Sequence, residues 1–273
     1  ARQCLKLLPG ATDLVTVTIE GASNQEATDA SPDGDEVIDV ALYFGSEDIS
    51  ASRRVHYIQL KHSTKRGDKE LKASELKGTI AGFIAKYVGL LSHFSVEELA
   101  NKLRFEFIAT RPADSKVVEA LADLANGAKD RHPAIRKTLV GGTALDKAQI
   151  QEFFQLFRFQ ADEDDLWAQR NLLTQDVCAF LPDADIDAPV QLKELVTRKA
   201  TAEFERDPAI RRRDVLRALK TSEEDLCPAE SHIPDTSGLM PRRQEPEILS
   251  TVRTTDVPFV IHADGGIGKS VIA

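Results

Sequence analysis

The chain has 273 residues, of which 42% are hydrophobic and 29% are charged, so it can form one large domain or two smaller ones. It has no run of 18 apolar residues, so we expect no membrane-spanning helix and no membrane partner. Its three cysteines, Cys4, Cys178 and Cys227, lie far apart without a C-x-x-C pair, which argues against a disulfide framework or a zinc knuckle and favours a cytoplasmic protein. Without a signal sequence or an initiator Met, the chain is expected to be a segment of a longer polypeptide.

Charge is distributed unevenly, although the net charge of −9 by itself disfavours nucleic-acid binding. Residues 7–52 include ten acids and no Lys or Arg, whereas residues 53–77 include eight Lys or Arg and three acids. A second basic block, 198–220, has eight Lys or Arg and four acids. An acidic stretch followed by a basic one suits cations and phosphates together, and two solvated faces remain the alternative.

The first half of the chain alternates between strand and helix signals. Period-two alternation and flanking turn residues predict strands over 13–21, 37–45, 54–60 and 104–112. An apolar stripe at helical spacing predicts a helix over 73–92, the Ser95/Glu98 capping box begins a short one, and another covers 115–128. The order strand, strand, strand, helix, strand, helix predicts an α/β core with a mixed sheet.

Strand signals vanish from Asp146 onward. Helices are predicted over 147–157, 164–181, 190–205 and 212–219, and a Pro-rich linker follows. We therefore predict three regions: an α/β domain over 1–145, an all-α connector over 146–235, and the start of a further domain over 236–273.

The last region contains "FVIHADGGIGKS", an apolar strand that runs into a Gly-rich turn and then Gly-Lys-Ser. Such a loop wraps phosphates with backbone N–H groups, while its Lys reaches the β/γ-phosphates and its Ser binds Mg²⁺. Ala263 stands where the first Gly of the pattern is usual. The residues that would bind ATP with Mg²⁺ are Gly265, Gly266, Gly268, Lys269 and Ser270.

This loop, together with "LMPRRQEPEI" before it, resembles STAND-type signalling NTPases, such as those with NACHT or NB-ARC modules. The resemblance covers some 35 residues at the C-terminus. The acidic motif that follows the P-loop in such proteins is absent, so this segment is not expected to hydrolyse ATP by itself.

The stretch "VHYIQLKHSTK" places Gln59 and Lys61 on one face of the third strand, because residues two apart share a face. Asp39 likewise interrupts the preceding apolar strand. A carboxylate, an amide and the backbone carbonyl of Leu60 are hard oxygen ligands suited to Mg²⁺, and an amine steadies charge that develops on a phosphate. The alternative is a buried Asp39–Lys61 salt bridge that holds the two strands in register.

These residues resemble the PD-(D/E)xK nucleases in the variant with Gln before x-Lys, over about 13–110. "IDVALYF" and "IQLKHS" are similar to the N-terminal nuclease domains of bacterial antiphage effectors, among them the double-stranded DNA endonucleases of CBASS systems and nuclease-bearing antiviral STAND proteins. The resemblance implies a restriction-endonuclease-like sheet with flanking helices.

The resemblance also implies roles for individual residues. Asp39 and Gln59 would be Mg²⁺ ligands, with Leu60 contributing its carbonyl, and Lys61 would position the attacking water or stabilise the pentavalent phosphorus. Family members add a Glu from an N-terminal helix, which this sequence lacks before Asp13. Glu20 and Glu36 are the candidates for that ligand, and Glu36 is the weaker because it faces away from Asp39.

The function that follows is a Mg²⁺-dependent double-stranded DNA endonuclease in an antiphage NTPase, activated by ATP-dependent homo-oligomerisation on a phage-derived trigger. One alternative is a catalytically inactive adaptor or oligomerisation domain, and another is an NTPase that is the whole output. We interpret His62 as a strand-end histidine, and Trp167 with Phe153, Phe154 and Phe157 as helical core. Two basic segments, Lys65 to Lys69 and Arg211–Arg213, are candidates for DNA contacts, the second alternatively for a domain interface.

Overall fold

The computed structural model describes residues 1–8, 12–26, 34–63, 67–181, 185–201 and 207–226. Contacts within the chain group Ala1–Leu226 into one compact unit and Cys227–Ala273 into a second. The five P-loop residues, Gly265 to Ser270, fall in the second unit and lie outside the described residues, as does the predicted Pro-rich linker. Lys65 and Arg66 also lie outside them.

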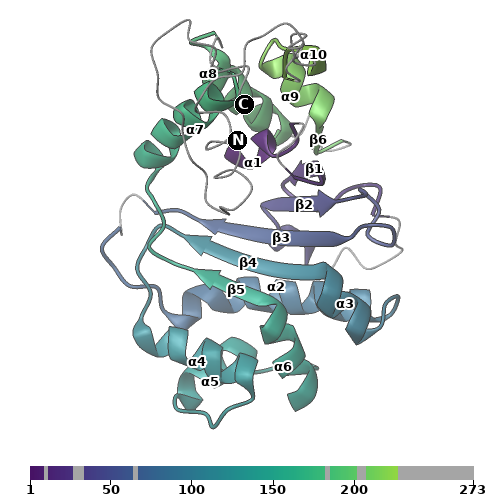
Figure 1. Cartoon of the computed structure of the whole chain (residues 1–273). Coiled ribbons are helices and arrows are strands. Elements are labelled where there is room, and N and C mark those ends of the chain that lie inside the picture. The colour runs from purple at the N-terminus through teal and green to yellow at the C-terminus, as the bar shows by residue number, and fades with distance from the viewer. Residues whose placement is uncertain (9–11, 27–33, 64–66, 182–184, 202–206, 227–273) are drawn as a thin grey trace, which may run out of the picture. The chain divides into compact units, whose positions relative to one another are not determined.

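A mixed sheet runs through the first unit in the order β5-β4-β3-β2-β1-β6 (Figure 1). Its strands are β1 (Leu14–Ile19), β2 (Val40–Phe44), β3 (Arg54–Lys61), β4 (Leu103–Ala109), β5 (Phe157–Gln160) and β6 (Ala209–Arg211). β6, β1, β2 and β3 pair antiparallel, whereas β3, β4 and β5 pair parallel. The predicted α/β class and mixed sheet are confirmed, and β3 is a central strand.

Helices lie on both faces of the sheet (Figure 1). Their bounds are α1 (Arg2–Leu5), α2 (Ala73–Leu91), α3 (Val96–Lys102), α4 (Ser115–Asn126), α5 (Pro133–Val140), α6 (Lys147–Leu156), α7 (Leu166–Phe180), α8 (Ala188–Lys199), α9 (Arg212–Ala218) and α10 (Glu223–Leu226), with a 3₁₀ turn η1 (Asp35–Val37). No helix among the described residues is long and apolar enough to cross a membrane.

Two hydrophobic cores result from the alternation of side chains along the strands. Tyr43 and Tyr57 point to the face covered by α2 and α4 to α6 and join the larger core. Leu42 and Ile58, one residue away along β2 and β3, point to the other face and pack with α1 and α7 to α9. Each buried strand is therefore apolar on both faces, which explains its near-continuous hydrophobic sequence.

The prediction that strands end before Asp146 was wrong. β5 begins directly after α6, and its alternating Phe159 and Phe157 contact Phe107 and Phe83 across the core. β6 has three residues and runs directly into α9, so neither strand is long enough to show a period of two. The four helices predicted in this region are present, and the predicted boundary at residue 145 falls inside the first compact unit.

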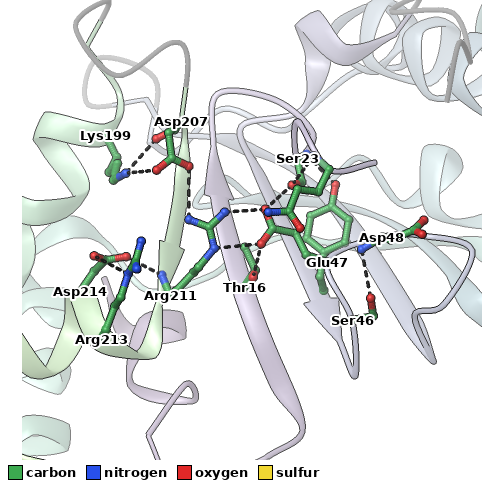
Figure 2. A network of polar contacts seen from close by, with 12 residues as sticks. Thr16, Ser23, Ser46, Glu47, Asp48, Lys199, Asp207, Arg211, Arg213 and Asp214 are labelled. Carbon is green, nitrogen blue, oxygen red and sulfur yellow. Dashed lines mark hydrogen bonds and ion pairs between the residues drawn. The ribbon is translucent and has the colours of Figure 1, made fainter. Parts of the chain in front are cut away.

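Arg211 joins β6 to the rest of the sheet (Figure 2). Its guanidinium donates to both carboxylate oxygens of Glu47, at 2.9 and 3.0 Å. Glu47 also accepts hydrogen bonds from the hydroxyls of Thr16 and Ser23. These contacts link residues 164 positions apart, so the C-terminal part of the first unit is fastened to the first strands.

A buried polar network lies between the sheet and α2. The Lys86 side chain is 4% exposed, and its Nζ lies 2.8 Å from Asp35 Oδ1 and 3.5 Å from Glu26 Oε1. The hydroxyls of Tyr43 and Tyr57 both donate to Glu26. Burial, followed by the charge of Glu26, raises the pKa of both tyrosines well above the usual range. The network thus holds β2 and β3 against the helix that covers them.

We expect Lys86→Met to lower the free energy of unfolding by about 3 kcal/mol, because it leaves the Glu26 and Asp35 carboxylates without their cation. Lys77→Met on the exposed face of the same helix is the matched control and should change it by less than about 0.5 kcal/mol. Urea unfolding followed by circular dichroism measures both. Equal losses in the two variants would contradict a role for the buried network.

Candidate functional site

The candidate site lies where β2 separates from β3. The last paired residues are Val40 and Ile58, and the Asp39 N–H donates to the Ile58 carbonyl at 3.0 Å. Before Asp39 the chain turns into η1, so β3 continues through Gln59 and Lys61 without β2 beside it. β4 accompanies β3 on the other side as far as Ala109.

The Asp39 carboxylate occupies the position that β2 vacates. Its Oδ2 accepts from the Gln59 amide Nε2 at 2.5 Å and from the Leu60 backbone N–H at 2.5 Å. A strand residue directs its N–H and C=O to the same side, so the Leu60 carbonyl also points to the side vacated by β2. The predicted neighbours Asp39, Gln59 and Leu60 do come together, although Asp39 precedes β2 rather than lying inside it.

Electrostatics couple Asp39 to its surroundings. Burial raises the pKa of the half-buried Asp39 carboxyl, and the Leu60 N–H, the Gln59 amide and the Lys61 charge oppose that rise. Partial burial also raises the pKa of Glu20, with the Asp39 charge as the second cause. The Lys61 ammonium and the Glu20 carboxylate are therefore both near enough to act on Asp39.

Glu20 reaches this position from the end of β1. Its backbone has a positive φ of 58°, and its N–H donates to the Asp39 carbonyl at 2.9 Å. Glu36, the other candidate for the second carboxylate, instead accepts from the Gly34 N–H on η1. The arrangement favours Glu20 over Glu36.

The alternative of a buried Asp39–Lys61 salt bridge was wrong. Lys61 is exposed at the end of β3, beyond the last residue of β3 that pairs with β2, so its amine is not buried beside Asp39. The Lys61 amine therefore stays in contact with water, and no desolvation free energy is lost. Next to it the exposed His62 lies with Nδ1 3.3 Å from Thr110 Oγ1, as a strand-end histidine would.

The donor set suits Mg²⁺ in chemistry, because it consists of two carboxylates, an amide oxygen and a backbone carbonyl. Among the residues that the structure describes, no three His, Cys, Asp or Glu side chains gather where a metal ion would bind. An ion here would therefore use the Gln59 and Leu60 oxygens beside Asp39 and Glu20. The Gln59 amide, which now donates to Asp39, would have to turn its oxygen inward.

The interpretation of Trp167 as helical core was wrong, whereas Phe153 and Phe154 are buried as expected. Trp167 is 71% exposed in the first turn of α7, whose buried positions lie further along at Leu173 and Val177. The sequence gives no sign that the first turn of α7 is exposed while its later turns are buried. The turn before α7 contacts the end of β4, through the Glu163 N–H and the Ala109 carbonyl at 3.1 Å.

Comparisons with known proteins add little to this geometry. No protein-family model matches the chain, and no curated protein does. Two similar solved structures are those of the Acinetobacter baumannii Cap4 SAVED/CARF-domain containing receptor with the cyclic trinucleotides 2'3'3'-cAAA and 3'3'3'-cAAA. Each match has a TM-score of 0.39 and 12% identity, over 87% of this chain and 50% of the receptor chain. This chain spans about half the length of those receptors.

We expect Asp39→Asn to stabilise the protein at neutral pH by about 0.5–1 kcal/mol. Replacing a functional carboxylate that is held in an unfavourable, partly buried position often has this effect. Folding raises the pKa of Asp39, so the native state binds its proton more tightly than the unfolded state. Stability therefore falls as pH rises from the unfolded value of about 4 through the raised native pKa.

The gain from Asp39→Asn should shrink at about pH 3, below the unfolded pKa of Asp, where both states hold the proton. Asp48→Asn is the matched control. The Ser50 hydrogen bonds lower the pKa of Asp48, so this substitution should decrease stability at neutral pH instead of increasing it. Urea unfolding across a pH series measures both variants. A loss of stability in Asp39→Asn at neutral pH would contradict this account of the site.

Proposed function

We propose that the first unit is a Mg²⁺-dependent endonuclease that cleaves double-stranded DNA. The observation that supports this proposal is the convergence of Asp39, Gln59 and the Leu60 backbone at the point where two strands part, with Lys61 next along β3. A polar cluster of this kind at a strand end, open on one side, is a suitable place for a phosphate and a metal ion. The resemblance to PD-(D/E)xK nucleases in the sequence agrees with it.

The residues of the site have complementary roles in this proposal. Asp39, Glu20, the Gln59 oxygen and the Leu60 carbonyl hold Mg²⁺, which when bound polarises the phosphodiester and lowers the pKa of a water molecule. Lys61 stabilises the charge that grows on the phosphate oxygens or orients the water. The hydrogen bonds from Gln59 and Leu60 hold the Asp39 carboxylate in one orientation.

Local charge accounts for DNA binding in spite of the acidic total. Lys61, Lys69 and Lys72 are exposed and follow one another along the end of β3 and the segment that leads to α2. Contacts to phosphates from such residues give affinity without sequence preference and weaken as salt rises. The substrate is therefore expected to be general duplex DNA.

The wider setting proposed is an antiphage NTPase, and it rests on the sequence resemblances alone. A phage-derived trigger would promote ATP-dependent homo-oligomerisation through the P-loop region, and nuclease units brought together would cleave DNA. Mg²⁺ would serve both the nuclease site and the bound ATP.

An inactive adaptor is the second candidate, and one observation favours it. Gln59 and Leu60 already satisfy Asp39 Oδ2, and the described residues bring no third carboxylate, His or Cys to the site. In this reading the fold remains and its chemistry is lost, while the unit serves assembly.

Plasmid cleavage distinguishes the two functions. We expect the full-length polypeptide, incubated with supercoiled plasmid, Mg²⁺, ATP and a lysate of phage-infected cells, to nick and linearise the DNA. Asp39→Ala and Lys61→Ala should each slow cleavage by at least about 100-fold, because each removes a group that acts on the transition state. Lys116→Ala, an exposed lysine on α4 outside the site and the basic segment, is the control and should retain most activity. Plasmid left equally intact by wild type and all variants would favour the adaptor.

A further inference from the structure

An acidic and aromatic turn stands out on the surface of the first unit. It comprises Asp162, Glu163, Asp164, Asp165, Leu166 and Trp167, all of them exposed. Leu166 is 50% exposed and Trp167 is 71% exposed. Tryptophan is strongly buried on average and is enriched at the centres of protein interfaces, so this exposure indicates a contact surface.

The acidic–aromatic turn is held firmly in this form. The Asp162 N–H donates to the Arg111 carbonyl at 2.9 Å, and Asp162 has a positive φ of 62°. The Asp165 carboxylate accepts from the Ala168 N–H and so begins α7. The ring of Trp167 already has a guanidinium over it, that of Arg170 at 5.5 Å from the centroid. The surface therefore offers an exposed indole and carboxylates, which together suit a guanidinium or ammonium group.

A surface of the opposite character lies on α9. Arg213 and Arg217 lie four residues apart on α9, so they share one face, and both are exposed. Lys220, just beyond the helix, is also exposed and lies 3.4 Å from Asp185. The Arg213 side chain is 74% exposed and lies 3.9 Å from Asp214, whereas Arg211 is engaged with Glu47 (Figure 2). In the view of Figure 1, the start of α7 and α9 lie on opposite sides of the helical layer.

We propose that the acidic–aromatic turn of one copy of this chain binds the basic face of α9 on another copy. An arginine from α9 would stack on the indole of Trp167 while its neighbours pair with Glu163 and Asp164. Because the two surfaces differ, the contact is heterologous and lets further copies add head to tail. The proposal does not depend on the nuclease function.

Duplex DNA fits the acidic–aromatic turn poorly as a partner, since four neighbouring carboxylates repel phosphates. The contact between copies should be weak on its own, because exposed ion pairs and a single cation–π contact each contribute little. We expect a dissociation constant on the order of 10 to 100 μM at low salt. Raising the salt to about 0.5 M should abolish association, because the Debye length then falls well below 10 Å.

Sedimentation velocity of the 273-residue chain tests the proposal with two silenced variants. One removes the turn's chemistry, Glu163→Gln/Asp164→Asn/Trp167→Ala, and retains Asp165, which begins α7. The other removes the basic face, Arg213→Gln/Arg217→Gln. Wild type should form species that grow with concentration up to about 100 μM at low salt, and each variant alone should remain monomeric.

Mixing the two silenced variants gives the decisive result. Each retains the surface that the other lacks, so an equimolar mixture should form a 1:1 heterodimer that does not grow further. Lys77→Gln/Lys116→Gln on exposed faces of α2 and α4 removes the same charge and should associate as wild type does.

Three outcomes would overturn the proposal: a wild type that stays monomeric, silenced variants that associate normally, or a mixture that stays monomeric. If the Arg213→Gln/Arg217→Gln variant associates normally but no longer binds duplex DNA, the basic face of α9 would be a DNA-binding surface instead. Unchanged thermal melts establish that the exposed substitutions leave the fold intact.

Discussion

The close approach of Gly34 to Gly82 determines where the second strand of the sheet can begin. Gly34 has a φ of +92°, and a side chain there would overlap the Gly82 carbonyl of α2. A Cβ on Gly82 would in turn lie 2.6 Å from Val37 Cγ2. The backbone of η1 therefore lies directly on the helix, which also brings Asp35 to Lys86. Gly34 is required for the close contact between the two backbones, and Gly82 leaves room for the Val37 side chain, so neither position tolerates a larger residue without movement of η1.

The candidate site follows from that contact. Because the chain before Asp39 lies against α2, it cannot run beside β3, and the Leu60 N–H is left without a strand partner. The Asp39 carboxylate takes that N–H, at the cost of partial burial that raises its pKa. A carboxylate held in this way contributes little to stability by itself, so the two cores on either side of the sheet must supply the free energy that keeps it there.

Much of this arrangement could be predicted from the sequence, because polar residues in apolar strands are informative. Asp39 and Gln59 interrupt strands that are otherwise hydrophobic, and strand periodicity predicted that Gln59 and Lys61 share one face. The predicted Asp39–Lys61 salt bridge was wrong because the starting point of β2 depends on the Gly34–Gly82 contact, which no periodicity encodes. The prediction that Trp167 is buried was wrong because only the tertiary structure decides which end of an apolar helix is covered.

The two short strands at the edges of the sheet could not be predicted from the sequence either. β5 and β6 have four and three residues, and their extended form comes from pairing with β4 and β1 rather than from local propensity. β6 covers the edge of β1, which would otherwise present unpaired backbone groups, and the Pro208 carbonyl accepts from the Ile19 N–H directly before Glu20. The region predicted as a separate connector is therefore a structural part of the sheet that positions the candidate site, and the Arg211–Glu47 contact fixes it there.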